Sequence, residues 1–300
     1  MPVGAGGGVE RMPLIERLAV IGTGLIGGSF ALALKQAGQV GTVVGAGRSR
    51  DNLHAAKTRG ILDEIAADAA RAVQGADFVL LAVPVGQIEG VMQAIGPGLA
   101  PEAVISDVGS TKQDVVALAR HHLAASLGRF VPGHPIAGAE TSGAEAARAD
   151  LFSGRNVVLT PLPDTNFRAL VKTQSAWQAC GAKVSLMQAA QHDRIFAAVS
   201  HLPHLLAFAL VDMLAGRPDA EVLFNYAASG FRDFTRIAAS SSEMWRDIGL
   251  ANRHALLAEL NAYEAKMEEL KAALAAADGD ALNTIFSRAQ AARAAWSKKQ

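Results

Sequence analysis

Cysteine is nearly absent from this chain, because Cys180 is the only one among 300 residues. A single cysteine cannot form an internal disulfide, and such a composition fits a reducing compartment. We therefore expect a cytoplasmic protein. Half of the residues are hydrophobic, which is enough to bury a core in each of about two domains.

An excess of charge is also missing, since 28 basic and 28 acidic side chains cancel. No field of one sign therefore favours nucleic acid or an anionic membrane as a partner. Long uninterrupted apolar runs are missing too. The richest stretch, 195–214, is interrupted by Ser200, His201, Pro203, His204 and Asp212, which argues against a membrane span. Residues 1–16 lack the apolar core of a signal peptide and are interpreted as a flexible extension.

The pattern of predicted secondary structure changes once along the chain, near residue 186. Before it, short apolar runs alternate with alanine-rich helical segments, which is typical of a parallel sheet covered on both faces. The expected strands are 17–21, 42–44, 77–83, 103–108, 130–131, 156–160 and 183–185. After it, helical patterns continue to the end. The sequence predicts an α/β protein: a doubly wound Rossmann-type domain over 17–186, then an all-helical domain over 187–300 that completes its core by dimerising.

A glycine-rich turn follows the first predicted strand directly. In such turns the first glycine allows a tight bend, the second lets the backbone approach a pyrophosphate and the third lets helix pack on strand. The pattern therefore predicts a bound dinucleotide. The expected contacts are Gly22, Thr23, Gly24, Leu25, Ile26 and Gly27, with Val83, Pro84 and Asp107 at the ends of two later strands.

The choice between NADP and NAD depends on the end of the second strand. NAD-binding folds usually place a carboxylate there for the ribose hydroxyl, whereas this chain has Arg48, Ser49 and Arg50. These side chains can donate charge-assisted hydrogen bonds to a 2′-phosphate. We favour NADP, with NAD as the alternative and with an ordinary helix cap as the other interpretation of this segment.

Five motifs carry the chemistry, and together they identify a family. They are Ser106–Lys112, Gly133–Glu140, Ser200–His204, Gly230–Ala238 and Met244–Asp247. In this order they strongly resemble the prephenate/arogenate dehydrogenase family of tyrosine biosynthesis over residues 17 to 270. The resemblance implies oxidative decarboxylation of prephenate or arogenate, with hydride transfer to the nicotinamide and without a metal. A dimer is expected through the helical domain.

His134 is the expected catalytic base. Its unperturbed pKa near 6.5 suits proton transfer at physiological pH, and its position at a strand end opens it to a cleft. By resemblance, His134 draws the proton from the substrate's ring hydroxyl, and Ser110 orients both groups. The alternative is a structural histidine.

Arg236 is the best candidate to hold a substrate carboxylate, because a guanidinium binds carboxylates through two hydrogen bonds. A surface ion pair with Asp233 or Asp247 is the alternative, and we prefer that alternative for Arg232. His201 and His204 share one helical face beside Pro203, which should kink or open the helix. By resemblance, these two histidines border the substrate's side chain.

The remaining expected substrate contacts are Ser200, Glu140, Asp233 and Trp245. By resemblance the two acids gate the site or steady the arginine, and Trp245 either crosses from a partner subunit or packs inside its own helical core. A zinc site at His192, His201 and His204 lacks a usual ligand set, so we expect no metal. Since 200–206 contain no acid to pair with an ammonium, prephenate is favoured over arogenate.

Two other classes of protein were weighed. A β-hydroxyacid dehydrogenase would need a lysine in its helical domain, and 184–265 contain none. A non-catalytic dinucleotide sensor would not need Ser110, His134 and Arg236 to converge, and a cofactor-reduction assay separates it from an enzyme.

Overall fold

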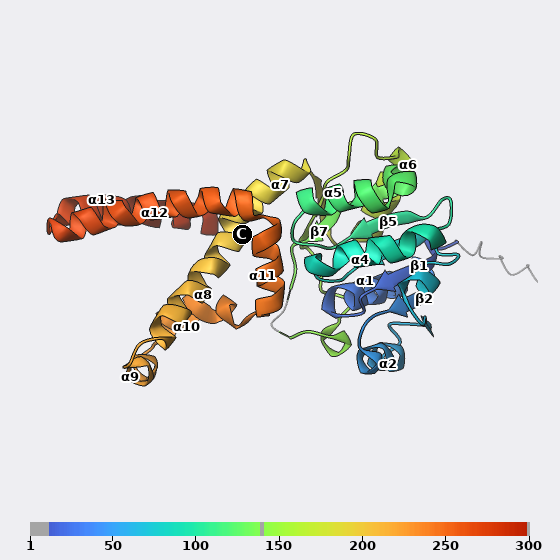
Figure 1. Ribbon diagram of the computed structural model, residues 1–300, viewed down its shortest axis with the longest axis horizontal. Coiled ribbons are helices and arrows are strands. Elements are labelled where there is room, and N and C mark those ends of the chain that lie inside the picture. The colour runs from blue at the N-terminus through green and yellow to red at the C-terminus, as the bar shows by residue number, and fades with distance from the viewer. Residues whose placement is uncertain (1–11, 139–140, 299–300) are drawn as a thin grey trace, which may run out of the picture. The chain divides into compact units, whose positions relative to one another are not determined.

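The computed structural model describes residues 12–138 and 141–298 (Figure 1). Two compact units result, one ending at Asn252 and the other beginning at Arg253. The first contains both sheets and every candidate site residue that the structure describes. The predicted domain boundary at 186 falls between β9 and α7 within this unit, and it stays a prediction.

A six-stranded parallel sheet forms the centre of the first unit, in the order β3-β2-β1-β4-β5-β6. Because β1 lies between β2 and β4, the chain crosses over the sheet in both directions, as the doubly wound prediction requires. The strands are β1 Ile15–Ile21, β2 Val40–Ala46, β3 Glu64–Ile65, β4 Phe78–Leu81, β5 Val104–Asp107 and β6 Phe130–Val131.

Both faces of this sheet are buried, and alternate strand residues enter different cores. Leu18 and Val20 pack with Phe30 of α1 and Trp177 of α6, whose rings lie 4.6 Å apart. Ala19 and Ile21 instead join the core under α3, α4 and α5. The helices of this domain are α1 Leu25–Gln36, α2 Arg50–Thr58, α3 Ala69–Ala72, α4 Val85–Ile95, α5 Gln113–His122 and α6 Phe167–Ala179, with short 3-10 turns at Gly96–Gly98, Ala124–Arg129 and Ala144–Ala146.

The later strands do not extend the main sheet, contrary to the expectation of one parallel sheet. β7 Gly133–Pro135, β8 Asn156–Leu159 and β9 Lys183–Leu186 form a separate sheet, in which β7 runs antiparallel to β8. The amide of Gly133 donates to Asp107 at the end of β5, so the small sheet begins beside the carboxyl edge of the large one. His134 is thereby held at that edge.

A nearly continuous helix follows β9. It consists of α7 Ala189–Phe196, a π-helical turn Ala197–His201 and α8 Leu202–Ala215. Pro203 has no amide hydrogen to donate to the carbonyl four residues before it, which accounts for the predicted opening of the helix. The unit ends with α9 Ala220–Asn225, α10 Ser229–Thr235, the 3-10 turn Arg236–Ala239 and α11 Ser242–Ala251.

By length and composition alone, the helix over Ala189–Ala215 could cross a membrane, contrary to our expectation that no segment could. Only 28% of its most apolar window is buried. Yet His192, Asp193 and His201 are buried polar residues within this helix. Their hydrogen bonds, described below, connect the helix to the nucleotide-binding domain.

The second unit consists of α12 Arg253–Ala275 and α13 Gly279–Ser297, two long helices that lie side by side (Figure 1). Between them Ala277 has a φ of 49°, and Asp278 caps α13 by accepting from the amide of Ala281. The helical character predicted for the C-terminal part is confirmed.

Candidate active site

The glycine turn between β1 and α1 has the shape that a dinucleotide requires. Gly22 has a φ of 101°, and a Cβ there would lie 2.3 Å from the carbonyl oxygen of Ala82. A Cβ on Gly27 would meet the carbonyl of Gly22 at 2.2 Å, so these two glycines are required by the fold itself. Gly24 differs, because nothing lies within 4 Å of its Cβ position. Gly24 therefore provides open space at the N-terminus of α1, where a pyrophosphate fits.

Gly24→Ala is expected to weaken NAD(P) binding while leaving the melting temperature almost unchanged. The added methyl group meets no protein atom, but it occupies the space that the pyrophosphate needs. Gly22→Ala is the matched control, since it strains the backbone by roughly 1–3 kcal/mol and should lower the melting temperature. Cofactor titration by fluorescence, together with thermal melting, measures both effects. Unchanged cofactor affinity in Gly24→Ala would argue against a dinucleotide at this turn.

The end of β2 exposes Arg48, Ser49 and Arg50. The Ser49 hydroxyl accepts from the amide of Asn52 at 3.2 Å and so caps α2. Asn52 in turn donates to the carbonyl and the hydroxyl of Thr23 at 3.0 and 3.1 Å, which connects this segment to the glycine turn. The segment that carries the two exposed arginines is therefore connected by hydrogen bonds to the glycine turn.

The loop after β4 lies against the same turn. Val83 is half-buried and has its Cγ1 3.1 Å from the Cβ position of Gly22, while Pro84 is exposed and precedes α4. Both residues are at the carboxyl end of a strand next to β1, as predicted.

Asp107, another predicted cofactor contact, lies beneath the site and is completely buried. One oxygen accepts from the amide of Gly109 at 2.8 Å and the other from Gly133 at 3.1 Å. The buried ammonium of Lys112 also pairs with this carboxylate. Asp107 therefore holds together the two segments that carry Ser110 and His134, and its predicted contact with the cofactor stays a prediction.

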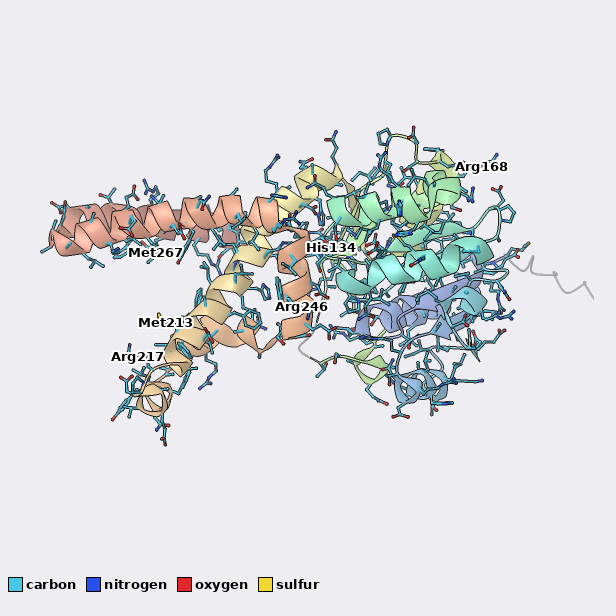
Figure 2. All side chains as sticks on the ribbon, in the orientation of Figure 1. His134, Arg168, Met213, Arg217, Arg246 and Met267 are labelled. Atoms are coloured by element: carbon cyan, nitrogen blue, oxygen red, sulfur yellow. The ribbon has the colours of Figure 1, made fainter. Side chains whose placement is uncertain are left out.

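His134 lies where the sheets meet α7, and its Nδ1 is 2.8 Å from Nε2 of His192 (Figure 2). The other ring nitrogen of His192 is 2.8 Å from Oδ1 of Asp193. Phe196 covers the pair, with its ring centre 4.8 Å from that of His134. Burial lowers the pKa of His134 well below its ordinary value, and charges at His192, Lys112 and His201 lower it further. His134 is therefore neutral at pH 7.

Sequence reasoning assigned the orientation of His134 to Ser110, and the structure adds a contact that was not predicted, between Nδ1 of His134 and Nε2 of His192. Ser110 is half-buried on the loop between β5 and α5. Its predicted role toward the substrate hydroxyl stays a prediction. His192 had been considered only as a zinc ligand, whereas its two ring nitrogens lie against His134 and Asp193. Within 12–138 and 141–298, no cluster of three or more His, Cys, Asp or Glu side chains could hold a metal.

The two histidines near Pro203 approach the same tryptophan, as their shared helical face predicts. The ring of His204 stacks on Trp245 at 3.7 Å between centres, and His201 meets that ring edge-on at 6.0 Å. Trp245 is 8% exposed, so it packs inside its own chain. Burial lowers the pKa of His201 to about 4 and also lowers that of His204, an effect to which the charge of Arg236 adds.

The other predicted substrate contacts lie on the segments around these histidines. Ser200 is half-buried, and its carbonyl accepts from Nδ1 of His204 at 2.8 Å. Asp233 is exposed near the end of α10, and Arg236 is exposed in the 3-10 turn that follows. Asp247 pairs with Arg246 at 2.7 Å. Glu140 lies outside the described residues.

Sequence reasoning gave no role to three buried residues near His134, namely Asp193, Lys112 and Asn252, and it did not predict the contact between His192 and His134. Asn252 donates to the carbonyl of Asp193 at 2.8 Å and lies 3.1 Å from Nδ1 of His201. Adjacent His192 and Asp193 at the start of an apolar helix were the available signal, since buried polar pairs need partners.

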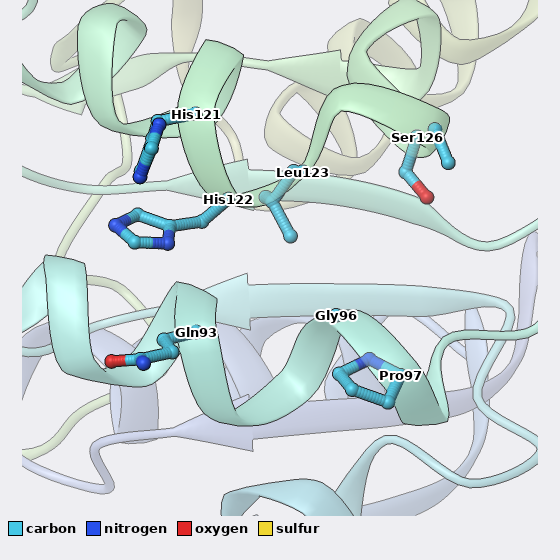
Figure 3. Close-up of a pocket in the computed structure, with 8 residues that line it drawn as sticks. Gln93, Gly96, Pro97, His121, His122, Leu123 and Ser126 are labelled. Carbon is cyan, nitrogen blue, oxygen red and sulfur yellow. The ribbon is translucent and has the colours of Figure 1, made fainter.

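A surface pocket of about 320 Å³ lies elsewhere, between the ends of α4 and α5 (Figure 3). His122 in its wall meets Glu89 at 3.2 Å. The pocket lies at the carboxyl end of α5, and therefore at the edge of the sheet opposite the glycine turn. Ligands of open α/β sheets bind at the other edge. This pocket is therefore separate from the candidate site.

Comparison with known proteins agrees with this geometry. Protein-family models described as "Prephenate dehydrogenase, nucleotide-binding domain" and "Prephenate dehydrogenase, dimerization domain" match residues 30–186 and 188–288. The chain is 37% identical to a cyclohexadienyl dehydrogenase of Zymomonas mobilis, and the match covers 95% of this chain and 97% of the relative.

Solved structures give the same result. The crystal structure of prephenate dehydrogenase from Aquifex aeolicus, in complex with hydroxyphenyl propionate and NAD+, has a TM-score of 0.87 and 34% identity, covering 93% of this chain and 97% of that one. Arogenate dehydrogenase from Synechocystis has a TM-score of 0.78 and 29% identity, covering 93% and 99%. The nucleotide turn, the histidine site and these similarities agree: the chain is an oxidoreductase that belongs to the prephenate dehydrogenase family.

Proposed function

We propose that this protein oxidises and decarboxylates prephenate to 4-hydroxyphenylpyruvate with NADP as the preferred cofactor and NAD as the alternative. The observation that carries this proposal is His134, a neutral and half-buried histidine at the carboxyl edge of a dinucleotide-binding sheet, whose Nδ1 is occupied by His192. Its Nε2 is therefore the nitrogen that remains for a substrate.

His134 acts first as a base. Its Nε2 draws the proton from the ring hydroxyl as the hydride leaves the same carbon, and Ser110 orients the hydroxyl. The nicotinamide, when bound, supplies the hydride acceptor. Loss of the ring carboxylate as carbon dioxide returns the electron pair to the ring, and His134 gives the proton back to the phenolic oxygen. Arg236 holds a carboxylate of the substrate.

The substrate's side chain is proposed to lie near His201, His204 and Trp245. Residues 200–206 contain no acid that would attract an ammonium, and burial and the charge of Arg236 both lower the pKa of His204. Prephenate, with its keto acid, suits that environment better than arogenate. The Synechocystis neighbour is an arogenate dehydrogenase, which makes arogenate the second candidate.

A direct test compares initial rates with prephenate and arogenate, each with NADP and NAD. We expect the highest kcat/KM for prephenate with NADP. A higher value for arogenate would reverse the substrate assignment. If neither cofactor were reduced, the result would favour the non-catalytic dinucleotide sensor instead.

Arg48→Ala is expected to raise KM for NADP far more than for NAD. A charge-assisted hydrogen bond to the 2′-phosphate contributes roughly 1.5–3 kcal/mol, which corresponds to about a 10- to 150-fold change. Lys57→Ala is the matched control, because Lys57 is an exposed cation near the other end of α2. Equal effects of Arg48→Ala on both cofactors would remove the basis for NADP.

We also propose that the protein acts as a cytoplasmic homodimer. The match to a dimerization domain over 188–288 supports it, as does the low burial of the apolar helix Ala189–Ala215 in the single chain. Val199 and Met213 on this helix are 67% and 58% exposed. A second copy would cover such apolar side chains.

A further inference from the structure

Three side chains form one line of hydrogen bonds that begins at the proposed base. Nδ1 of His134 is 2.8 Å from Nε2 of His192, and Nδ1 of His192 is 2.8 Å from Oδ1 of Asp193. His192 and Asp193 are 0% and 1% exposed. The line therefore runs from the half-buried His134 into the interior of the unit.

The carboxylate at the end of this line fixes where each proton lies. An ionised carboxylate only accepts hydrogen bonds, so the hydrogen between Asp193 and His192 belongs to Nδ1 of His192. A neutral His192 then has a lone pair on Nε2, which must accept from Nδ1–H of His134. A neutral His134 with its proton on Nδ1 has its lone pair on Nε2. The base is thus presented in the one tautomer that can take a proton at Nε2.

Asp193 is itself held in place by backbone amides. Oδ1 accepts from the amide of Lys112 at 2.8 Å, and Oδ2 accepts from the amide of Gln113 at 2.9 Å at the start of α5. Asn252 donates to its carbonyl at 2.8 Å. Burial acts to raise the pKa of Asp193, but these hydrogen bonds and that of His192 leave the pKa below its ordinary value. Asp193 is therefore a fixed, ionised acceptor.

We infer that His192 and Asp193 are positioning residues, which lock His134 in the Nδ1–H tautomer and stabilise the positive charge that it gains during hydride transfer. The inference rests on the proposed function for its kinetic consequences, but the tautomer itself does not depend on any activity. Negative charge at Asp193 is conveyed to His134 through the ring of His192, as in other sites where a carboxylate orients a catalytic histidine.

The charges around His134 and His192 affect whether these two rings are protonated at neutral pH. Lys112 and His201 lower the pKa of His134, and Lys112 also lowers the pKa of His192, whereas Asp193 and Asp107 raise the latter. Burial outweighs the two carboxylates, so His192 stays neutral and keeps its Nε2 lone pair at pH 7.

Two substitutions at His192 separate positioning from packing. His192→Gln retains an amide oxygen that can accept from Nδ1–H of His134, whereas His192→Leu fills the space and removes the acceptor. We expect His192→Leu to lower kcat for prephenate about 100-fold with KM within about threefold, and His192→Gln to recover at least about tenfold of that loss. His122→Leu, at the histidine paired with Glu89, is the control and should leave kcat unchanged.

A second measurement keeps the inference testable without turnover. Two-bond proton–nitrogen NMR correlations of the histidine-labelled protein report tautomers, with signals assigned through His134→Asn and His192→Gln. Both His134 and His192 should carry their proton on Nδ1 at pH 7. A proton on Nε2 of His134, or equal kcat losses in His192→Leu and His192→Gln, would overturn the inference. Absence of prephenate turnover in the unmodified enzyme would instead refute the proposed function, and the NMR result would still decide the positioning.

Discussion

His134→Asn is expected to lower kcat by about 10²- to 10⁴-fold, the contribution of a positioned general base. Asparagine places an amide nitrogen near the position of Nδ1, so the hydrogen bond to His192 and the local packing can persist. What is lost is the lone pair at Nε2. Steady-state kinetics with prephenate, with thermal melting as the folding control, should show a large fall in kcat with little change in KM.

The pH profile gives the same substitution a second signature. His134 must be unprotonated to act, and its pKa is lowered by burial and by nearby charges. Activity should therefore stay constant through neutral pH and fall only as the pH drops through that lowered pKa, below about 6.5. In His134→Asn this acidic limb should disappear. A variant that retained the limb would point to another base, with His201 the next residue to test.

Substitution of Arg236 is expected to produce the second large effect. A guanidinium can bind a carboxylate through two hydrogen bonds, whereas the ammonium of lysine is a compact charge. Arg236→Ala should raise KM for prephenate about 10- to 150-fold, the equivalent of roughly 1.5–3 kcal/mol, and Arg236→Lys should raise it less. Affinity for NADP should stay nearly unchanged in both variants, as titration of each ligand would show.

Arg232→Ala provides the matched control for this pair, because Arg232 is an exposed arginine on the adjacent helix α10. It should leave the KM for prephenate unchanged. If both Arg236 variants bound prephenate normally yet melted at a lower temperature, Arg236 would be a structural ion-pair residue. Arg232 would then become the candidate for the substrate anchor.

Most of the fold could be predicted because its signals are local. The run from Leu18 to Ile21 is apolar at every position, as strands buried on both faces are, and the glycine turn follows it at once. The small second sheet could not be predicted. β7 has only three residues, too few to show a periodicity, and neither its antiparallel pairing with β8 nor the hydrogen bond from Gly133 to Asp107 has a local signal in the sequence.

The candidate site was predictable where a residue type carries its own chemistry, as His134 and Arg236 do. It was not predictable where the chemistry comes from contacts between distant segments. Asp193 lies 81 residues from Lys112, and its function as an acceptor for two backbone amides depends on where α5 begins. The strand-end position of Asp107 suggested a ligand contact, whereas its burial and its ion pair with Lys112 could not be predicted from the sequence.

The π-helical turn before Pro203 sets the direction in which His201 faces. Nine residues separate His192 from His201, which in a regular helix is about two and a half turns, so the two rings would face opposite ways. The additional residue taken up by the π turn sets this rotation back by about 100°. Asp193 and His201, which are eight positions apart, thereby lie on nearly the same face of the helix, and Asn252 contacts both. Deletion of one position within 197–200 should therefore restore a regular helix and leave His201 and His204 facing as they do now, because one residue fewer in a regular helix turns through about the same angle.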